Sequence, residues 1–267
     1  MDMPADRIMD VEILRVRDLR IGARASDTEI DILVDGIDLT LRRGEVLGLI
    51  GESGAGKTTI GLAALAYTRP GCFIIDGKIE FDGVDIRKLS REERRKFRGK
   101  RIAYVAQSAV ESFNPAMSII RQVCEMPVRH GLNSYADAKR DAIALFHELD
   151  LPFPERFGDR YPFQVSGGQL QRAMLAMAMS CRPDIVVFDE PTTALDVTTQ
   201  IEVLIAIRKL IRDHGTAGIY ISHDLAAGAK IATETLSENR TQRVLPCKCS
   251  SSQLALISGM QERSALV

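Results

Sequence analysis

The sequence predicts an α/β fold with a mostly parallel core sheet and an inserted helical segment. Residues 46–50 are a continuous apolar run between turn residues, which is typical of a strand buried on both faces. Apolar runs at residues 102–106, 185–188 and 217–221 alternate with segments of helical character, and this alternation favours parallel pairing. Residues 117–149 show helical periodicity without a clear strand, which indicates a helical insertion.

The N-terminal part of the chain adds further strands to this core. Short strands are predicted at residues 13–19 and 37–41, on either side of a polar segment at residues 24–31. We expect these N-terminal strands to pair in antiparallel fashion. A helix over residues 57–67 and a strand at residues 77–81 are predicted to follow.

Composition argues against a nucleic-acid partner. The chain has 267 residues, with 35 Lys and Arg against 36 Asp and Glu, so its formal net charge is −1. A broad nucleic-acid surface usually shows as a basic excess, so no nucleic-acid partner is expected. Residues 89–100 are rich in Arg, Lys and Glu, and the interspersed acids favour a solvated helix face over a nucleic-acid patch.

No targeting or membrane-spanning segment is predicted. The sequence has no apolar run of about 18 residues, the length that crosses a bilayer. Residues 1–6 are acidic and polar, unlike a secretory signal. A cytosolic location is therefore expected, in which the five cysteines stay reduced.

Residues 51–58 fit the phosphate-binding pattern Gly-x-x-x-x-Gly-Lys-Ser/Thr, between the buried strand and a helix. Its glycines let backbone N–H groups approach phosphate oxygens, and the helix N-terminus adds partial positive charge. Lys57 would neutralise the β- and γ-phosphates, and the Thr58 hydroxyl would coordinate Mg²⁺. ATP and Mg²⁺ are the predicted cofactors. The predicted nucleotide-binding residues of this loop are Gly51, Glu52, Ser53, Gly54, Ala55, Gly56, Lys57, Thr58 and Thr59.

The apolar run at residues 185–188 leads directly into Asp189 and Glu190. Asp189 would hold Mg²⁺, directly or through water, and Glu190 would polarise the water that attacks the γ-phosphate. Taken alone, such a run could be any strand that enters an acidic turn. The phosphate loop upstream makes the nucleotide interpretation the stronger one.

Residues 165–172, Val-Ser-Gly-Gly-Gln-Leu-Gln-Arg, resemble the signature motif of the ATP-binding cassette (ABC) family, the ATPase subunits of membrane transporters. The resemblance implies a P-loop NTPase (RecA-like) core with an inserted α-helical subdomain. It also implies that the motif completes the ATP site of a second subunit. The residues expected to contact the partner's nucleotide are Ser166, Gly167, Gly168 and Gln169.

Further motifs follow in the family's order over residues 14–231. Gln107 resembles the Q-loop glutamine, which touches Mg²⁺ and water. Residues 193–196 resemble the D-loop at the dimer interface, and His223 resembles the H-loop histidine that contacts the γ-phosphate. The resemblance thus implies catalytic roles for Glu190, His223 and Gln107, metal contacts for Thr58, Gln107 and Asp189, and nucleotide contacts for Asp189 and Asp196.

The domain organisation follows from this match. Residues 1–110 and 181–232 are predicted to form one ATP-binding core, and residues 111–180 the helical subdomain that carries the signature. Residues 233–267 depart from the family: the stretch is polar and lacks the expected apolar strand. We therefore expect an atypical, poorly ordered tail.

A second departure concerns the base of the nucleotide. Residues 19–34 contain no Phe, Tyr, Trp or His, so no adenine-stacking residue is identified there. The sequence predicts ATP binding with tolerance for GTP.

Ser112-Phe113-Asn114-Pro115 and Tyr161-Pro162-Phe163-Gln164 resemble the peptide and nickel importer branch of the family. This implies uptake of di- and oligopeptides or a related solute, energised by ATP hydrolysis. The implied partners are a second ABC ATPase subunit, identical or not, two transmembrane permease subunits and, indirectly, an extracytoplasmic solute-binding protein. The implied location is peripheral, on the cytoplasmic face of the inner membrane.

Two alternatives remain open at this point. One is a soluble ABC-type ATPase of DNA repair, translation or an accessory enzyme system, which would share every ATP motif. The other is a non-hydrolysing regulatory module. Glu190 and His223 are both present, so the catalytic residues do not support the second alternative.

Overall fold

The computed structural model describes residues 11–24, 29–51, 56–193, 195–223 and 243–246. The chain forms two compact units. The first unit comprises Met1–Lys88 and Ile219–Val267, and the second comprises Leu89–Gly218. The division predicted from the sequence, at residues 110 and 181, stays a prediction.

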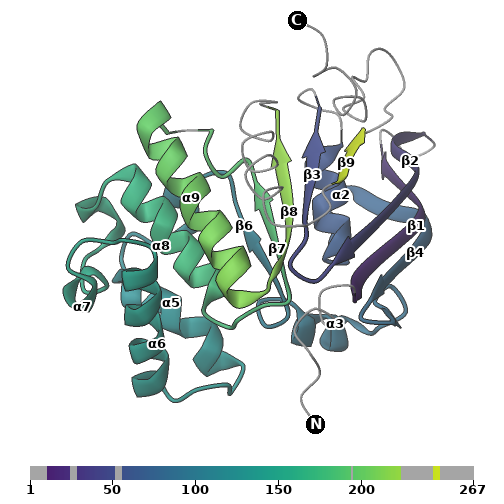
Figure 1. Cartoon of the computed structure of the whole chain (residues 1–267). Coiled ribbons are helices and arrows are strands. Elements are labelled where there is room, and N and C mark those ends of the chain that lie inside the picture. The colour runs from purple at the N-terminus through teal and green to yellow at the C-terminus, as the bar shows by residue number, and fades with distance from the viewer. Residues whose placement is uncertain (1–10, 25–28, 52–55, 194, 224–242, 247–267) are drawn as a thin grey trace, which may run out of the picture. The chain divides into compact units, whose positions relative to one another are not determined.

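The first unit contains a four-stranded antiparallel sheet (Figure 1). Strand β1 (Glu12–Arg24) pairs with β2 (Ile30–Arg42) on one side and with β4 (Cys72–Phe81) on the other, and β4 also pairs with β5 (Val84–Asp85). The predicted N-terminal antiparallel strands are therefore confirmed. They are longer than predicted because cross-strand pairing continues to Arg24 and Ile30, beyond the apolar runs.

The first unit also contains the buried strand β3 (Val46–Ile50), which leads toward helix α2 (Lys57–Ala64). In the sheet order β3 lies between β8 (Ala217–Ser222) and β9 (Arg243–Pro246). Every residue of β8 is buried. This environment explains why β3 and β8 read as continuous apolar runs rather than alternating ones.

Strand β9 corrects one expectation. The sequence indicated no strand after residue 232, but β9 pairs in parallel with β3, from Leu47 opposite Arg243 to Ile50 opposite Pro246. A ladder is built from backbone groups, so four residues can form one without a long apolar run. The other residues of that segment, 233–242 and 247–267, lie outside the described part of the chain.

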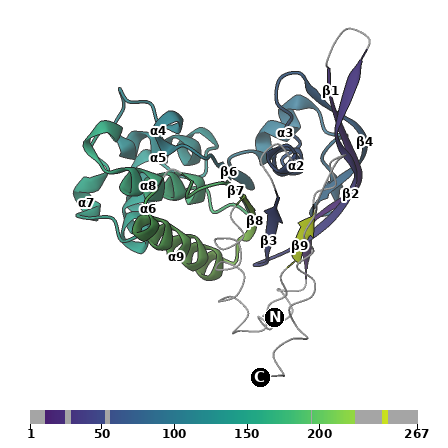
Figure 2. The same ribbon diagram turned by 90° about the horizontal axis from the view of Figure 1, so that it is seen from above.

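The second unit combines a parallel strand pair with helices (Figures 1 and 2). Strand β6 (Ile102–Val105) pairs in parallel with β7 (Ile185–Asp189), whose five residues are all buried. The helices are α3 (Arg91–Phe97), α4 (Ala109–Ser112), α5 (Ile119–Arg129), α6 (Tyr135–Glu148), α7 (Pro154–Phe157), the 3₁₀ turn η1 (Pro162–Gln164), α8 (Gly167–Met179) and α9 (Val197–His214).

Helices α5, α6 and α8 pack against one another and lie side by side in Figure 2. An apolar stripe along α6 faces this packing, and the Phe146 ring meets Phe157 edge to face at 5.3 Å between centroids. The stripe belongs to the core, since all its members are buried: Ala138, Ala142, Leu145, Phe146 and Leu149.

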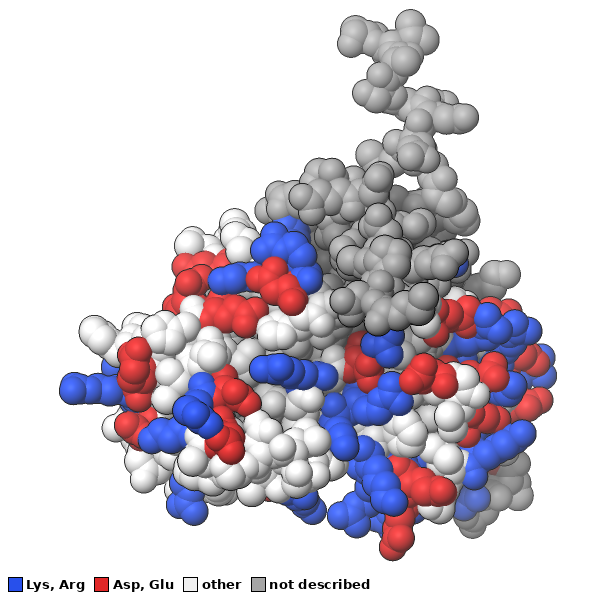
Figure 3. All heavy atoms as spheres, turned by 60° about the horizontal axis from the view of Figure 1, so that its bottom comes forward, with Lys and Arg blue, Asp and Glu red and all other residues white. Residues whose placement is uncertain are grey.

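Helix α3 has the solvated character that its sequence predicts. None of its residues is buried, and Ser90 and Glu93 form a reciprocal capping box at its start. Figure 3 shows Lys and Arg side chains interspersed with Asp and Glu side chains over the face drawn there. Among the residues that the structure describes, no helix is both long and apolar enough to cross a membrane.

Candidate functional site

The phosphate-binding loop of the first unit ends at a left-handed glycine. Gly56 caps α2 with φ of 74°, a conformation that a residue without Cβ adopts at little cost. Gly56 has no side chain with which to cap this helix, and the N–H groups at a helix start have no partners within the helix, so such a start suits an anion. Glu52, Ser53, Gly54 and Ala55 of the predicted loop lie outside the described residues.

Lys57 is held at this helix start. Its side chain is only 4% exposed, and its Nζ donates a hydrogen bond to the carbonyl of Gly51 at 2.7 Å. The ammonium group therefore lies against the beginning of the loop, where it could exchange a carbonyl for a phosphate oxygen. Thr58 and Thr59 follow in the first turn of α2, both half-buried. His223, which follows β8 directly, is exposed in the same unit.

In the second unit, β7 delivers Asp189 and Glu190 to its carboxyl end. The Glu190 backbone has φ of 48°, a left-handed conformation that is unfavourable for a residue with a long side chain. Its carboxylate Oε2 accepts one hydrogen bond from Gln107 Nε2 and one from Thr193 Oγ1, each at 3.1 Å. Two residues predicted to be catalytic, Gln107 and Glu190, therefore meet although they are 83 positions apart.

Asp189 is 5% exposed, and its Oδ2 accepts a hydrogen bond from the Tyr104 hydroxyl at 2.6 Å. Tyr104 was not among the residues predicted for the site. The sequence does place it close to the site, because Tyr104 belongs to the predicted strand that ends just before Gln107. Thr193 was predicted only as part of the D-loop, not as a partner of Glu190.

The signature motif forms the start of helix α8. Ser166 is the N-cap: its hydroxyl accepts a hydrogen bond from the Gln169 N–H at 3.3 Å, and its own N–H donates to Gln169 Oε1 at 3.3 Å. Ser166 and Gly167 are exposed, whereas Gly168 is buried. The exposed helix start thus offers backbone N–H groups on the protein surface, as anion binding requires.

The D-loop forms the start of α9, beside the signature. Asp196 caps α9 and accepts hydrogen bonds from the Thr199 N–H at 3.1 Å and the Thr199 hydroxyl at 2.7 Å. The hydroxyl bond, followed by the backbone bond, lowers the pKa of Asp196. A Cβ atom on Gly168 would lie 2.2 Å from Thr199 Cγ2, so the two helix starts are in close contact. Ala194 of the D-loop lies outside the described residues.

The predicted site residues are therefore distributed over both units. The described members in the first unit are Gly51, Gly56, Lys57, Thr58, Thr59 and His223, and those in the second are Gln107, Ser166, Gly167, Gly168, Gln169, Asp189, Glu190 and Asp196.

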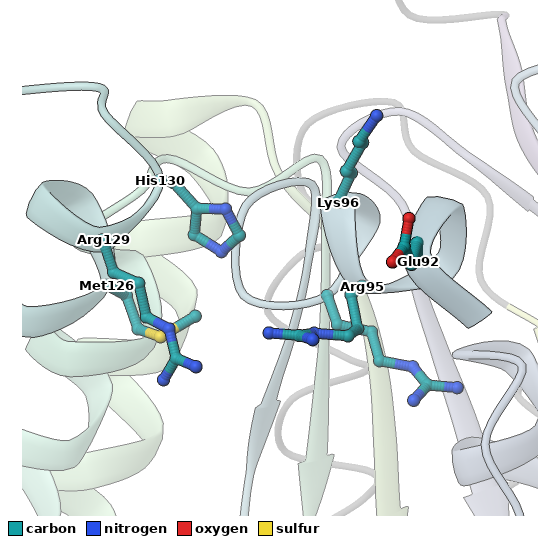
Figure 4. A pocket seen from close by; sticks show the side chains of 7 residues that line it. Glu92, Arg95, Lys96, Met126, Arg129 and His130 are labelled. Carbon is teal, nitrogen blue, oxygen red and sulfur yellow. The ribbon is translucent and has the colours of Figure 1, made fainter.

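A hollow of about 490 Å³ also lies in the second unit, next to α3 and α5 (Figure 4). Arg95, Lys96, Arg98 and Arg129 make its lining strongly basic. The Nε2 atom of His130, which also lines it, is buried and has no hydrogen-bond partner in the described part of the chain. The remaining lining residues are Glu92 and Met126. None of the predicted nucleotide residues that the structure describes belongs to this lining.

Comparison with known proteins indicates one protein family. Residues 34–193 match the family model described as ABC transporter. The chain is 34% identical over 224 residues to the probable D,D-dipeptide transport ATP-binding protein DdpD of Escherichia coli (strain K12), covering 84% of this chain and 68% of that protein. It is 36% identical over 222 residues to the oligopeptide transport ATP-binding protein OppD of Bacillus subtilis (strain 168), covering 82% and 62%.

A third relative has a different named solute. The chain is 40% identical over 200 residues to the metal-staphylopine import system ATP-binding protein CntD of Staphylococcus aureus (strain Mu50 / ATCC 700699), covering 75% of this chain and 73% of that protein. The chain thus spans only about two thirds of the length of the two peptide-transport relatives.

Among solved structures, the ATP-binding cassette MJ0796 is similar in fold. Its dimeric post-hydrolysis state bound to ADP and Pi has a TM-score of 0.70 and 24% sequence identity, covering 81% of this chain and 90% of that chain. This likeness confirms the predicted α/β fold, with a mostly parallel core sheet, N-terminal antiparallel strands and helices.

Proposed function

Because this chain belongs to the ABC transporter family, we propose that it binds and hydrolyses ATP as a subunit of an importer for di- or oligopeptides or a related solute. The predicted family is confirmed, and the names of the relatives agree with the predicted branch. The observation that carries the enzymatic proposal is Glu190, held by Gln107 and Thr193 at the end of a buried strand.

We propose that residues of the first unit bind the phosphates of ATP. Gly56 and the first turn of α2 receive phosphate oxygens, and Lys57 neutralises their charge. His223 contacts the γ-phosphate. This assignment rests on the motifs and on the geometry within each unit.

Glu190 is proposed to polarise the attacking water. The hydrogen bonds from Gln107 and Thr193 limit the freedom of its carboxylate, so that the oxygen that accepts the proton is positioned before the substrate arrives. Phosphoryl transfer depends mainly on positioning and on charge stabilisation, and both are supplied here without a covalent intermediate on the protein.

Magnesium fits the residues present. No group of three or more His, Cys, Asp or Glu side chains that could hold a metal occurs in the described ranges. Mg²⁺ usually binds proteins through one or two oxygen ligands and takes its other ligands from water and phosphate. The residues proposed to hold it are Thr58, through its hydroxyl, Asp189, through its carboxylate, and Gln107. When bound, Mg²⁺ neutralises charge on the phosphate oxygens.

The exposed start of α8 supports a partner subunit. Ser166 and Gly167 present a helix N-terminus on the surface, and we propose that it binds the γ-phosphate held by a second ATPase subunit. Two permease subunits in the membrane, served by an external solute-binding protein, complete the proposed importer. The pair of ATPase subunits would close on ATP and open after hydrolysis. This change would shift the permease between its inward-facing and outward-facing states.

Replacing Glu190 with Gln tests the enzymatic proposal. The amide keeps the shape but cannot act as a base, so we expect ATP affinity to stay within a few-fold and phosphate release to fall by at least about 100-fold. Glu125→Gln is the matched control, because Glu125 is a half-exposed residue on α5 outside the site, and it should hydrolyse ATP at the normal rate. Hydrolysis by E190Q near the normal rate would contradict the assignment.

Isolation of the tagged chain from solubilised membranes tests the importer. Recovery of two membrane-spanning subunits, with or without a second ATPase, is the expected result. Recovery of soluble partners alone would favour the soluble ATPase alternative instead.

A further inference from the structure

The strongest unassigned feature is the contact between Tyr104 and Asp189. In the parallel pair of β6 and β7, Tyr104 lies opposite Val187, and Asp189 follows Val187 by two positions. Side chains alternate along a strand, so Tyr104, Val187 and Asp189 share one face of the sheet. The diagonal separation of such positions is about 7 Å, which a tyrosine side chain can bridge.

The contact has the geometry of a charge-assisted hydrogen bond. The Tyr104 hydroxyl donates to Asp189 Oδ2 at 2.6 Å, within the range of about 2.5–2.7 Å for O–H donors on a carboxylate. Asp189 is 5% exposed, so its charge has little access to water and depends on donors from the protein. Tyr104 is half-buried. A bond to Oδ2 also fixes the plane of the carboxylate, and thereby the direction of Oδ1.

We propose that Tyr104 is a positioning residue that orients the Asp189 carboxylate for Mg²⁺. The proposal rests on the proposed role of Asp189 as a magnesium residue. Mg²⁺ requires near-ideal octahedral geometry at about 2.0–2.1 Å, so a small rotation of the carboxylate weakens the site. Partners that hydrogen-bond a metal-binding group from outside typically change metal affinity by about 10–100-fold when they are removed.

A purely structural role for Tyr104 makes a different prediction. If the ring only fills space beside β7, phenylalanine would replace it, because the two side chains differ by one hydroxyl. The magnesium dependence would then be unchanged. Only the orienting role makes the hydroxyl itself matter for the metal.

The test is Tyr104→Phe in the full chain, with binding of a fluorescent ATP analogue followed during a Mg²⁺ titration and again in EDTA. We expect the half-saturating Mg²⁺ concentration to rise about 10-fold, at the low end of the known range. Nucleotide affinity in EDTA should be unchanged, since the phosphate loop is untouched. Tyr135→Phe is the matched control, because Tyr135 is 48% exposed at the start of α6, and it should titrate as the unaltered chain does.

Two results would overturn the inference: a half-saturating Mg²⁺ concentration within twofold of the unaltered chain, or an equal loss of affinity in EDTA. If nucleotide binding by the unaltered chain shows no Mg²⁺ dependence, the proposed magnesium site itself fails, and the inference fails with it. The two failures are therefore distinguishable.

If Y104F does not fold, a second pair of variants decides. Asp189→Asn removes the charged acceptor, so adding Y104F to D189N should leave its thermal unfolding midpoint almost unchanged. If adding Y104F to D189N instead abolishes folding or clearly lowers the midpoint, the inference is overturned. The Tyr104 hydroxyl would then stabilise the chain independently of the Asp189 carboxylate.

Discussion

At the scale of single residues, Thr199 decides what the second glycine of the signature can be. A Cβ on Gly168 would meet Thr199 Cγ2 at 2.2 Å, whereas the next nearest atoms lie at 3.6 and 3.7 Å. The methyl group cannot easily move away, because the Thr199 hydroxyl is bonded to Asp196 at 2.7 Å. Close packing, rather than backbone strain, therefore requires glycine at position 168.

We expect Gly168→Ala to destabilise the chain by about 1–3 kcal/mol, the usual range for an overpacked site, and to lower ATP hydrolysis. Thermal unfolding and phosphate release measure the two effects. Thr199→Ser deletes the clashing methyl group but keeps the hydroxyl, so the G168A/T199S double variant should recover most of the stability.

Gly167→Ala is the matched control for this prediction. Its Cβ would lie 3.7 Å from Leu195 Cδ2, an ordinary contact. A G167A variant as unstable as G168A, or a double variant with no recovery, would contradict the steric explanation.

At the scale of elements, two helix N-termini share one capping bond but differ in their proposed function. Ser166 on α8 and Ser134 on α6 are both N-caps whose hydroxyls accept from the N–H three residues on, at 3.3 and 3.2 Å. The bond from the N–H to the N-cap hydroxyl is the same in both. Only the α8 start belongs to the proposed contact with a partner's nucleotide.

We therefore expect Ser166→Ala and Ser134→Ala to lower the free energy of unfolding similarly, by about 1 kcal/mol each. Denaturant unfolding checks this. ATP hydrolysis should fall in S166A and remain normal in S134A. Equal hydrolysis rates in the two variants would remove Ser166 from the site and leave it as a cap alone.

At the scale of the whole molecule, residues far apart in sequence complete the sheet around β3. Strand β9 pairs with β3 about two hundred positions later in the chain, through four residue pairs. Without β9, backbone groups on that side of β3 would lose their partners. Unpaired buried backbone groups cost about 1–3 kcal/mol each, against a total stability of about 5–15 kcal/mol.

Two shortened chains test the importance of β9, one ending after Pro246 and one after Gln242. They differ only by the four residues of β9. We expect the shorter chain to unfold at clearly lower temperature or denaturant concentration than the longer one. Identical unfolding of the two would show that β9 contributes nothing to the stability of the sheet.

The sequence by itself determined the features that depend on local chemistry. The Gly56-Lys57 end of the phosphate loop, the apolar strand before Asp189 and the Ser166-Gly167-Gly168 signature are contiguous patterns, so the sequence shows their chemical groups directly. The tertiary structure alone decided which groups meet. Tyr104 with Asp189, Gln107 with Glu190, and Gly168 with Thr199 are joined by sheet register and helix packing. The same is true of β9, because pairing energy comes from the partner strand and leaves little trace in the segment that pairs.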